Sequence, residues 1–286
     1  MIQSMTGFGK ATLQLPNKKI TVEVKSLNSK GLDLNVRMPS LYREMELTLR
    51  NQVSVALERG KIDFAIFIES TAEQTSTKVN VPILKAYIAQ LKEVQPDADE
   101  TELMKMAIRM PDAMKTERDE IDEDDWSQIQ GAIDQGLKNI KDFRTSEGVA
   151  LEKEFLHRIA NIMTMMNETV SLDAERIDTV KARLRTAIDE LKVTLDENRF
   201  EQELIFYLEK YDITEEKVRL ENHLNYFIET LAGTEANGRK LGFIVQEMGR
   251  EINTMGSKSN HSRMQKLVVQ MKDELEKIKE QVLNVL

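Results

Sequence analysis

The chain contains neither glycine nor proline between Gly148 and Gly233, and its five prolines all lie at or before Pro111. These two residues interrupt regular structure more often than any others, so a long stretch without them can form extended helices. Within this stretch, apolar residues recur at steps of three and four over residues 151–170 and again over residues 177–195. The spacing predicts amphipathic helices in the back half of the chain and places the strands in the front half.

The front half alternates apolar and polar residues in the manner of half-buried strands. Residues 21–25 and 32–36 each direct their apolar side chains to one face, and the turn residues 28–31 between them predict a β-hairpin. Residues 41–57 carry apolar side chains at a spacing of four, which predicts a helix, and residues 61–69 alternate again. These patterns predict an antiparallel or mixed sheet accompanied by helices.

Together the two halves predict an α+β fold in three parts. The parts are an N-terminal α+β domain at residues 1–145 with an acidic segment at about 97–125, a long helical arm at 146–200, and an all-α C-terminal domain at 201–286. In the last part, apolar residues over 264–285 alternate at steps of four and three, which predicts a seam for one partner helix from the same chain or another subunit. Because a long arm seldom buries its apolar stripe alone, we expect a homo-oligomer.

The formal net charge of −9 is unevenly distributed along the chain. Residues 97–125 hold twelve acidic and four basic side chains, whereas residues 237–266 hold six basic and two acidic ones. A phosphate-rich partner can therefore dock away from the acidic segment, so the negative total excludes no class of ligand.

The composition also indicates where the protein resides. There is no cysteine, no apolar run of the roughly 18 residues that a membrane span needs, and no secretory signal in the first residues. The absence of cysteine excludes disulfides, thiol catalysis and cysteine-ligated zinc. We therefore expect a cytoplasmic protein without a membrane partner.

The segment QEMGREINTMGSKSN at residues 246–260 is the richest in chemical groups. A helical projection of residues 241–255 gathers the apolar residues in one arc about 100° wide and places Glu247, Arg250 and Glu251 on the opposite side. The simplest interpretation is a solvated helix face on which Glu247 and Arg250 form a weak ion pair.

Three features of the same segment favour a binding site instead. Gln246 and Asn253 are uncharged amides suited to hydrogen bonding a ligand, and Gly242 and Gly249 form a strip where another backbone could approach. Gly256 is a candidate C-cap for the helix. Residues 254–260 then gather hydroxyls, an amide and a lysine ahead of the next helix, where backbone N–H groups suit a phosphate. The glycine spacing is not that of a nucleotide-binding P-loop.

These residues resemble the C-terminal signature of the YicC/YloC family of bacterial proteins. The matching positions are Gln246, Glu247, Met248, Arg250, Glu251, Asn253, Thr254 and 256–259. The likeness extends to residues 4–9, 23–28, 59–61, 212–224 and 279–285, and it thins out over roughly 90–145.

The resemblance implies an endoribonuclease that cuts single-stranded RNA with the help of a divalent cation, Mn²⁺ or Mg²⁺. It also implies a ring-like homohexamer, and no DNA specificity is expected. Carried over by position, Glu247 and Glu251 would be the metal carboxylates and catalytic residues, and Arg250 and Lys258 would neutralise the phosphate or the transition state. The residues that would hold RNA are Arg239, Lys240, Gln246, Asn253 and Ser257.

The chain departs from the family pattern at four positions. Gly242, Gly249, His261 and Leu286 stand where many members have an acidic residue, an asparagine, an aspartate and a glutamate. Metal ligation by carboxylates at positions 242 and 261 is therefore not available, whereas Glu247 and Glu251 are unaffected.

Two chemistries remain open for RNA cleavage. One uses the metal carboxylates, and the other uses the RNA 2′-hydroxyl as nucleophile with histidines as acid and base. His157 lies within the amphipathic arm and is interpreted as structural, and His261 as a loop residue. His223 sits among polar residues and is a catalytic candidate.

RNA binding and function also have alternatives outside the signature. Asn28, Lys30 and Arg37 in the predicted hairpin could reach RNA, since single strands are held by basic grooves and exposed edges. The alternative function is a non-catalytic RNA-binding or scaffolding oligomer, for which the apolar seam and the long arm would suffice.

Overall fold

The computed structural model describes residues 2–16, 18–70, 77–116, 123–190, 197–233 and 238–286. Its strands are β1 (Gly7–Gln14), β2 (Lys18–Leu27), β3 (Leu32–Arg37), β4 (Gly60–Ser70), β5 (Thr77–Val79) and β6 (Met114–Thr116). Its helices are the 3₁₀ helix η1 (Ser40–Met45), α1 (Glu46–Leu57), α2 (Val81–Val94), α3 (Glu100–Ala107), α4 (Glu123–Ser171), α5 (Asp173–Glu190), α6 (Glu197–Lys210), α7 (Thr214–Ala232), α8 (Gly238–Lys258) and α9 (Ser262–Val282). The predicted α+β fold with a helical C-terminal region is confirmed.

The main sheet has the strand order β1-β2-β4-β3. Strand β2 is antiparallel to both β1 and β4, whereas β3 is parallel to β4. The predicted hairpin between residues 21–25 and 32–36 is wrong, because β4 lies between these two strands. Helices η1 and α1 carry the chain from β3 to β4, the kind of crossover that parallel neighbours require. The alternation identified each strand, but it could not choose between partners that share the same pattern.

One face of the sheet packs against α1 and α4. Its side chains, each at most 3% exposed, are Ile20, Val22, Val24, Ile62, Phe64 and Ile66. Strand β1 lies directly against the backbone of α4, because a Cβ atom added to Gly9 would lie 2.3 Å from the carbonyl oxygen of Gly136. No described helix packs on the opposite face of the sheet.

Helix α4 contributes to two cores. Its first half packs Ile129, Ile133 and Ile140 on the sheet, and its second half packs side chains such as Phe155 and Ile159 among α7, α8 and α9. The helix passes residue 145 without interruption, and the domain limit placed there stays a prediction. The predicted arm at 146–200 is not one helix, since α4 ends at Ser171 and α5 begins at Asp173. Its residues 191–196 lie outside the described residues.

The helices α7, α8 and α9 form a bundle with the second half of α4. The apolar seam of α9 is buried there, through Met264, Val268, Met271, Leu275, Ile278 and Val282. The partners of this seam are α4 and α8 of the same chain, so the seam by itself requires no second subunit. None of the described helices combines the length and the apolar character needed to cross a membrane.

Residues 77–116 form a small unit of their own. It contains the antiparallel pair β5–β6 and a core in which Leu84, Ala107 and Ala113 are buried between α2 and α3. The predicted acidic segment at about 97–125 contributes α3 to this unit, and its residues 117–122 lie outside the described residues.

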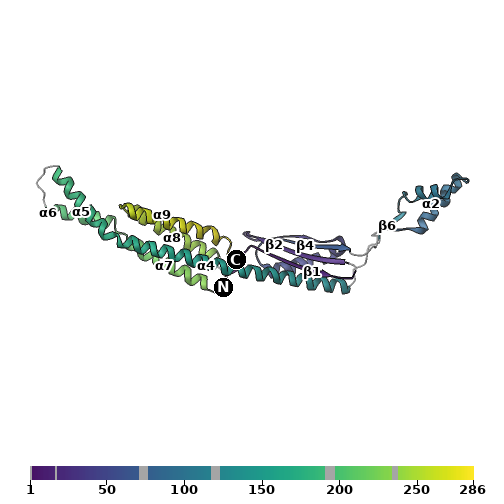
Figure 1. Ribbon diagram of the computed structural model, residues 1–286, viewed down its shortest axis with the longest axis horizontal. Helices are drawn as coiled ribbons and strands as arrows, with labels where there is room; N and C mark the ends of the chain where they lie inside the picture. The colour runs from purple at the N-terminus through teal and green to yellow at the C-terminus, as the bar shows by residue number, and fades with distance from the viewer. Residues whose placement is uncertain (1, 17, 71–76, 117–122, 191–196, 234–237) are drawn as a thin grey trace.

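Both chain ends lie beside the middle of α4, where the helix leaves the sheet and enters the bundle (Figure 1). Ser4 forms a bridge with Val285, and the N–H group of Leu286 donates to the carbonyl oxygen of Gln3 at 2.9 Å. The N–H group of Ser4 donates to the carbonyl oxygen of Arg144 in α4 at 3.0 Å. These backbone contacts join β1, the C-terminus and α4 at one place.

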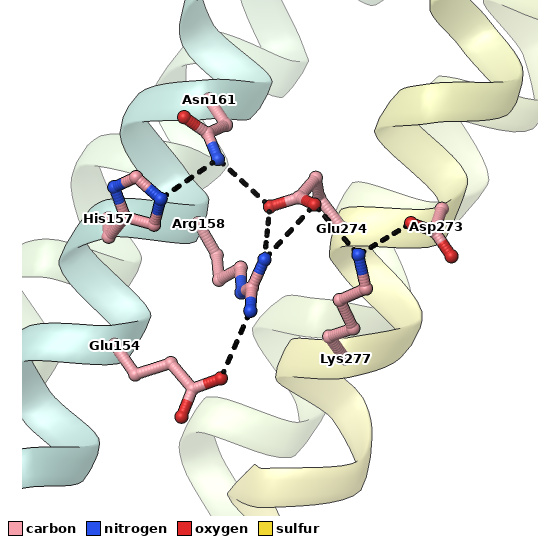
Figure 2. Close-up of polar contacts among 7 residues, drawn as sticks. All are labelled: Glu154, His157, Arg158, Asn161, Asp273, Glu274 and Lys277. Atoms are coloured by element: carbon pink, nitrogen blue, oxygen red, sulfur yellow. Dashed lines mark hydrogen bonds and ion pairs between the residues drawn. The ribbon is translucent and has the colours of Figure 1, made fainter.

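Polar side chains join α4 to α9 in the bundle (Figure 2). Glu274 of α9 accepts hydrogen bonds from Arg158 at 3.1 and 3.2 Å and from Asn161 at 3.0 Å. Lys277 donates to the same carboxylate at 3.0 Å. Burial raises the pKa of Glu274, but the hydrogen bonds, first from Asn161, outweigh it and lower the pKa to about 2. His157 contacts Asn161 at 3.4 Å at the edge of this network.

Glu274→Gln is expected to lower the free energy of unfolding by roughly 1–3 kcal/mol near pH 7, because Arg158 and Lys277 lose a charged acceptor. The folded pKa lies below its ordinary value of 4.5, so this stabilisation is complete above that pH and is lost as the pH falls towards about 2. Urea unfolding of both proteins near pH 7 and near pH 3 measures the effect. A difference in stability that stays constant over this range would contradict the prediction.

Candidate active site

Helix α8 carries most of the signature residues and packs between α7 and α9. Its buried apolar side chains, each at most 5% exposed, are Leu241, Ile244, Val245, Met248, Ile252 and Met255. This is the arc predicted from the helical projection. It determines which side of α8 is available to a ligand.

Three glycines at intervals of seven line the side of α8 that faces α9. Added Cβ atoms at Gly242, Gly249 and Gly256 would lie 3.8, 3.3 and 2.9 Å from side-chain atoms of Val282, Leu275 and Val268, respectively. The predicted approach of another backbone at Gly242 and Gly249 is wrong, because the atoms nearest to these two positions belong to side chains of α9. A Cβ atom at Gly242 would make an ordinary contact, whereas one at Gly256 would force Val268 to shift.

The solvent side of α8 carries Glu247 and Arg250. The side chain of Glu247 is 50% exposed and that of Arg250 is 74% exposed, with 3.8 Å between Oε2 of the glutamate and NH1 of the arginine. The other exposed signature residues are Arg239, Lys240, Gln246, Asn253 and Ser257. An exposed carboxylate beside a guanidinium can bind a cation or accept a proton while the guanidinium binds a phosphate.

Glu251 does not share this exposed side. It is only 5% exposed, so its predicted place opposite the apolar arc is wrong. Glu251 follows Ile244 by seven residues, which places it only about 20° beyond the edge of the apolar arc, within the buried part of the helix surface. Lys258, two turns further along, contacts α7, which identifies α7 as the neighbour on the side of Glu251.

Lys258 is paired with an acidic residue of α7. Its Nζ donates to Oε1 of Glu216 at 2.7 Å, and Glu216 is 4% exposed. Among the described residues, Oε2 of Glu216 has no hydrogen-bond partner. The hydrogen bond from the Thr214 hydroxyl, together with the charge of Lys258, holds the pKa of Asp212 below its usual value. Lys258 therefore lies among carboxylates at the start of α7.

His223 and Glu251 lie on the neighbouring helices α7 and α8. His223 is half-buried, and Glu251 is buried. The predicted catalytic histidine and the second predicted metal carboxylate therefore belong to adjacent helices of the bundle.

The segment predicted as a phosphate-binding loop is mostly helix. Helix α8 continues through Gly256 to Lys258, so the predicted stop at Gly256 is wrong. The hydroxyls of Ser257 and Ser259 donate to backbone carbonyl oxygens of the preceding turn at 3.1 and 2.6 Å. Gly256 serves close packing on α9 instead of ending the helix.

The predicted RNA-binding residues outside the signature belong to the sheet. Asn28 and Lys30 lie in the loop between β2 and β3. Arg37 ends β3 and lies opposite Ala65 of β4, on the face that no described helix covers. These three residues do not join the group on α8.

Two exposed aromatic residues near Glu247 were missed by the sequence analysis. Phe243, one turn earlier on α8, is 61% exposed. Tyr226 of α7 is 44% exposed, and Nζ of Lys240 lies 4.8 Å from the centre of its ring. The exposure of Phe243 could have been predicted from the sequence, because this residue falls outside the apolar arc of its own helix. Lys240, Phe243, Glu247 and Arg250 follow one another at steps of three and four, and we call these four residues the α8 stripe.

The two predicted metal carboxylates can supply only part of a metal site. Within the described ranges, no three Asp, Glu or His side chains are grouped so as to hold a metal ion. Glu247 and Glu251 offer the oxygen donors that Mg²⁺ and Mn²⁺ prefer, but Glu251 is buried. A cation at Glu247 would therefore need most of its ligands from water, from the substrate or from another subunit.

Comparison with known proteins identifies the family. The N-terminal region of YicC-like endoribonucleases matches residues 2–153, and their C-terminal region matches residues 169–286. The chain belongs to the YicC-like endoribonuclease family. A relative from Clostridioides difficile strain 630, named "Probable endoribonuclease YicC", is 34% identical over 293 residues and covers both chains completely. A relative of the same name from Haemophilus influenzae strain KW20 is 28% identical over 288 residues, again with complete coverage of both chains. The resemblance stated from the sequence is thereby confirmed over both halves of this YicC-like chain.

Proposed function

We propose that this endoribonuclease is a cytoplasmic, metal-dependent enzyme that hydrolyses phosphodiester bonds of single-stranded RNA at the α8 stripe. The observation that carries the proposal is the exposed pair of Glu247 and Arg250, which lies in the signature of a family of endoribonucleases. The charge pattern supports it, because this part of the chain is basic although the whole is acidic. The exposed aromatic ring of Phe243 supports a single-stranded substrate, whose bases are free to stack.

Each residue of the α8 stripe has a role in this proposal. The guanidinium of Arg250 binds the scissile phosphate and neutralises the charge that grows on its oxygens. Glu247 holds the cation, or accepts the proton of the attacking water. Lys240 contacts a neighbouring phosphate, and Phe243 stacks on a neighbouring base. Addition of water across the P–O bond then leaves one product with a phosphate and the other with a hydroxyl.

The cation would be held by Glu247, and by Glu251 if local rearrangement exposes its carboxylate. When bound, it would supply charge neutralisation and lower the pKa of a ligated water. The alternative uses the RNA 2′-hydroxyl as nucleophile with His223 as the base, and it leaves a 2′,3′-cyclic phosphate.

Removal of divalent cations with EDTA is expected to abolish cleavage of a labelled single-stranded RNA, and Mn²⁺ or Mg²⁺ should restore it. The metal-dependent route predicts product ends that are not cyclic. Gel analysis of the fragments before and after acid treatment or phosphatase treatment identifies these ends. Cleavage that persists in EDTA and yields a 2′,3′-cyclic phosphate would refute the metal route and favour His223.

We also propose assembly as a homo-oligomer, with the hexamer that the family resemblance implies. Ile205 and Phe206 of α6 support a subunit contact, because these adjacent apolar side chains are 57% and 66% exposed. Phe206→Asp is expected to reduce the molar mass measured by light scattering, and Leu47→Asp, at another exposed apolar position, should not. An unchanged mass for Phe206→Asp would exclude α6 as the contact.

A further inference from the structure

The uncovered face of the β1-β2-β4-β3 sheet carries aromatic side chains that the fold does not require. Phe8 of β1 is 40% exposed and Phe67 of β4 is 50% exposed, although the core of the sheet lies entirely on its other face. A solvated face of an antiparallel sheet is ordinarily polar. Two phenylalanines on such a face therefore indicate contact with a ligand.

The strand register places cations beside these rings. Phe8 lies directly opposite Lys25 of β2, whose Nζ is 5.8 Å from the centre of the ring. The next outward position on β1 is Lys10, and Arg37 lies in the same row across the sheet. Lys61 lies at the end of β4 beside the loop that contains Lys30. The cations thus lie beside Phe8 and in the row between the two aromatic positions.

Acidic residues also lie on this face. Glu23 lies 3.1 Å from Lys10 and 3.6 Å from Lys25, and the hydrogen bond from Lys10 lowers the pKa of Glu23. Asp63 accepts a hydrogen bond from Asn35 at 2.9 Å, and Asp33 lies opposite Lys61 in the register. Among the described residues, no ion pair occupies Lys30 or Arg37. These two cations therefore remain for an anionic ligand.

The two rings are spaced for a chain and not for a single small molecule. Phe67 lies opposite Thr21, and Thr21 lies opposite Thr12, four residues along β1 from Phe8. At the usual dimensions of a sheet, the rings are roughly 16 Å apart. Single-stranded nucleic acids bind in this manner, with bases stacked on exposed aromatic rings and phosphates held by nearby cations.

We infer that the uncovered sheet face is a second RNA-binding surface, on which Phe8 and Phe67 stack bases while Lys25, Lys61 and Arg37 hold the backbone. The inference rests on the proposed function, because it needs single-stranded RNA as the ligand. It gives the sheet a role in retaining the substrate, separate from the α8 stripe. It also explains the predicted use of Lys30 and Arg37, which lie on or beside this face.

The double variant Phe8→Leu/Phe67→Leu removes both rings and keeps apolar side chains of similar size. Its dissociation constant for a labelled oligoribonucleotide of about 15 nucleotides, measured by fluorescence anisotropy in EDTA, is expected to rise about tenfold or more. Phe8→Tyr/Phe67→Tyr retains the rings and should bind like the wild type. Phe143→Leu, at an exposed phenylalanine of α4 away from this face, is the matched control.

The outcomes separate this inference from the proposed function. If the leucine variant binds RNA like the wild type, the sheet face is not an RNA platform, whether or not the protein cleaves RNA. If its affinity falls while no variant and no cation gives cleavage, the platform stands and the proposed function fails. If light scattering shows that the variant changes its oligomeric state instead, the face is a contact between copies of the chain and the inference is overturned.

Discussion

Glu247→Gln is expected to slow the cleavage of single-stranded RNA by about 10²–10⁴-fold. The amide keeps the shape of the side chain but can neither bind a cation strongly nor accept a proton. Because half of the Glu247 side chain is already exposed, the free energy of unfolding should change by no more than about 0.5 kcal/mol. Initial rates with a labelled RNA, together with the affinity for uncleaved RNA in EDTA, measure the effect.

Two further variants make this experiment decisive. Glu276→Gln removes a carboxylate that is 59% exposed on α9, and it should cleave RNA like the wild type. Glu251→Gln should also slow cleavage at least a hundredfold if the buried carboxylate becomes a ligand of the cation (about 3 kcal/mol of lost stabilisation). Cleavage at the wild-type rate by an intact Glu247→Gln oligomer would show that the site has been assigned to the wrong residue. Loss of cleavage only in Glu251→Gln would move the chemistry from the exposed side of α8 to its buried side.

Glu251 illustrates what a helical projection can and cannot predict. The projection identified the apolar arc of α8 correctly, because those side chains are buried by any neighbour. It assigned Glu251 to the solvent side, although this carboxylate lies seven residues after Ile244 and only about 20° beyond the edge of the arc. A single helix does not show which neighbours will cover that edge. With both α7 and α9 packed on α8, the boundary of burial moves past the apolar residues and includes a carboxylate.

For the same reason, the sequence pattern could not predict which distant elements pair with one another. The strands around Val22 and Leu34 were recognised from their alternation, yet the partner of both is β4. The glycine strip of α8 was predicted to admit another backbone, but α9 places side chains against it instead. Local spacing predicts elements well, whereas the choice of partner depends on contacts between residues far apart in sequence.

Phe8, Phe67 and Phe243 are exposed, which the sequence pattern did not predict. The chain has few aromatic residues, and a phenylalanine in a strand or an amphipathic helix is ordinarily counted with the core. Their exposure appears only when the core is known to lie on the other side. The position of Phe243 on its own helix, outside the apolar arc, indicated its exposure. The exposure of Phe8 and Phe67 could be predicted only once it was known which face of the sheet α4 covers.

Arg144→Met is expected to lower the free energy of unfolding by about 3–5 kcal/mol, the largest effect on stability that we predict for a single side chain. The Arg144 side chain is 1% exposed in α4, and burial lowers its pKa. Its guanidinium donates to the carbonyl oxygens of Leu57 at 3.2 Å, Met5 at 3.3 Å and Arg59 at 3.2 Å. Methionine would fill the space but remove the charged donor from all three carbonyl oxygens, of which those of Met5 and Leu57 each keep one other donor.

Urea unfolding measures this loss, and Arg43→Met, at an exposed position of η1, is the control expected to change stability by less than about 0.5 kcal/mol. A small effect of Arg144→Met would mean that water can replace the guanidinium.

The position of Arg144 also has a consequence for function. It holds the start of β1 and the end of α1 to the helix that also carries the bundle, at the place where both chain ends meet. If the sheet face binds RNA as inferred above, this joint determines how that face is oriented relative to the α8 stripe. A variant that remains folded but loosens the joint should therefore bind short RNA normally on each surface and cleave long RNA more slowly.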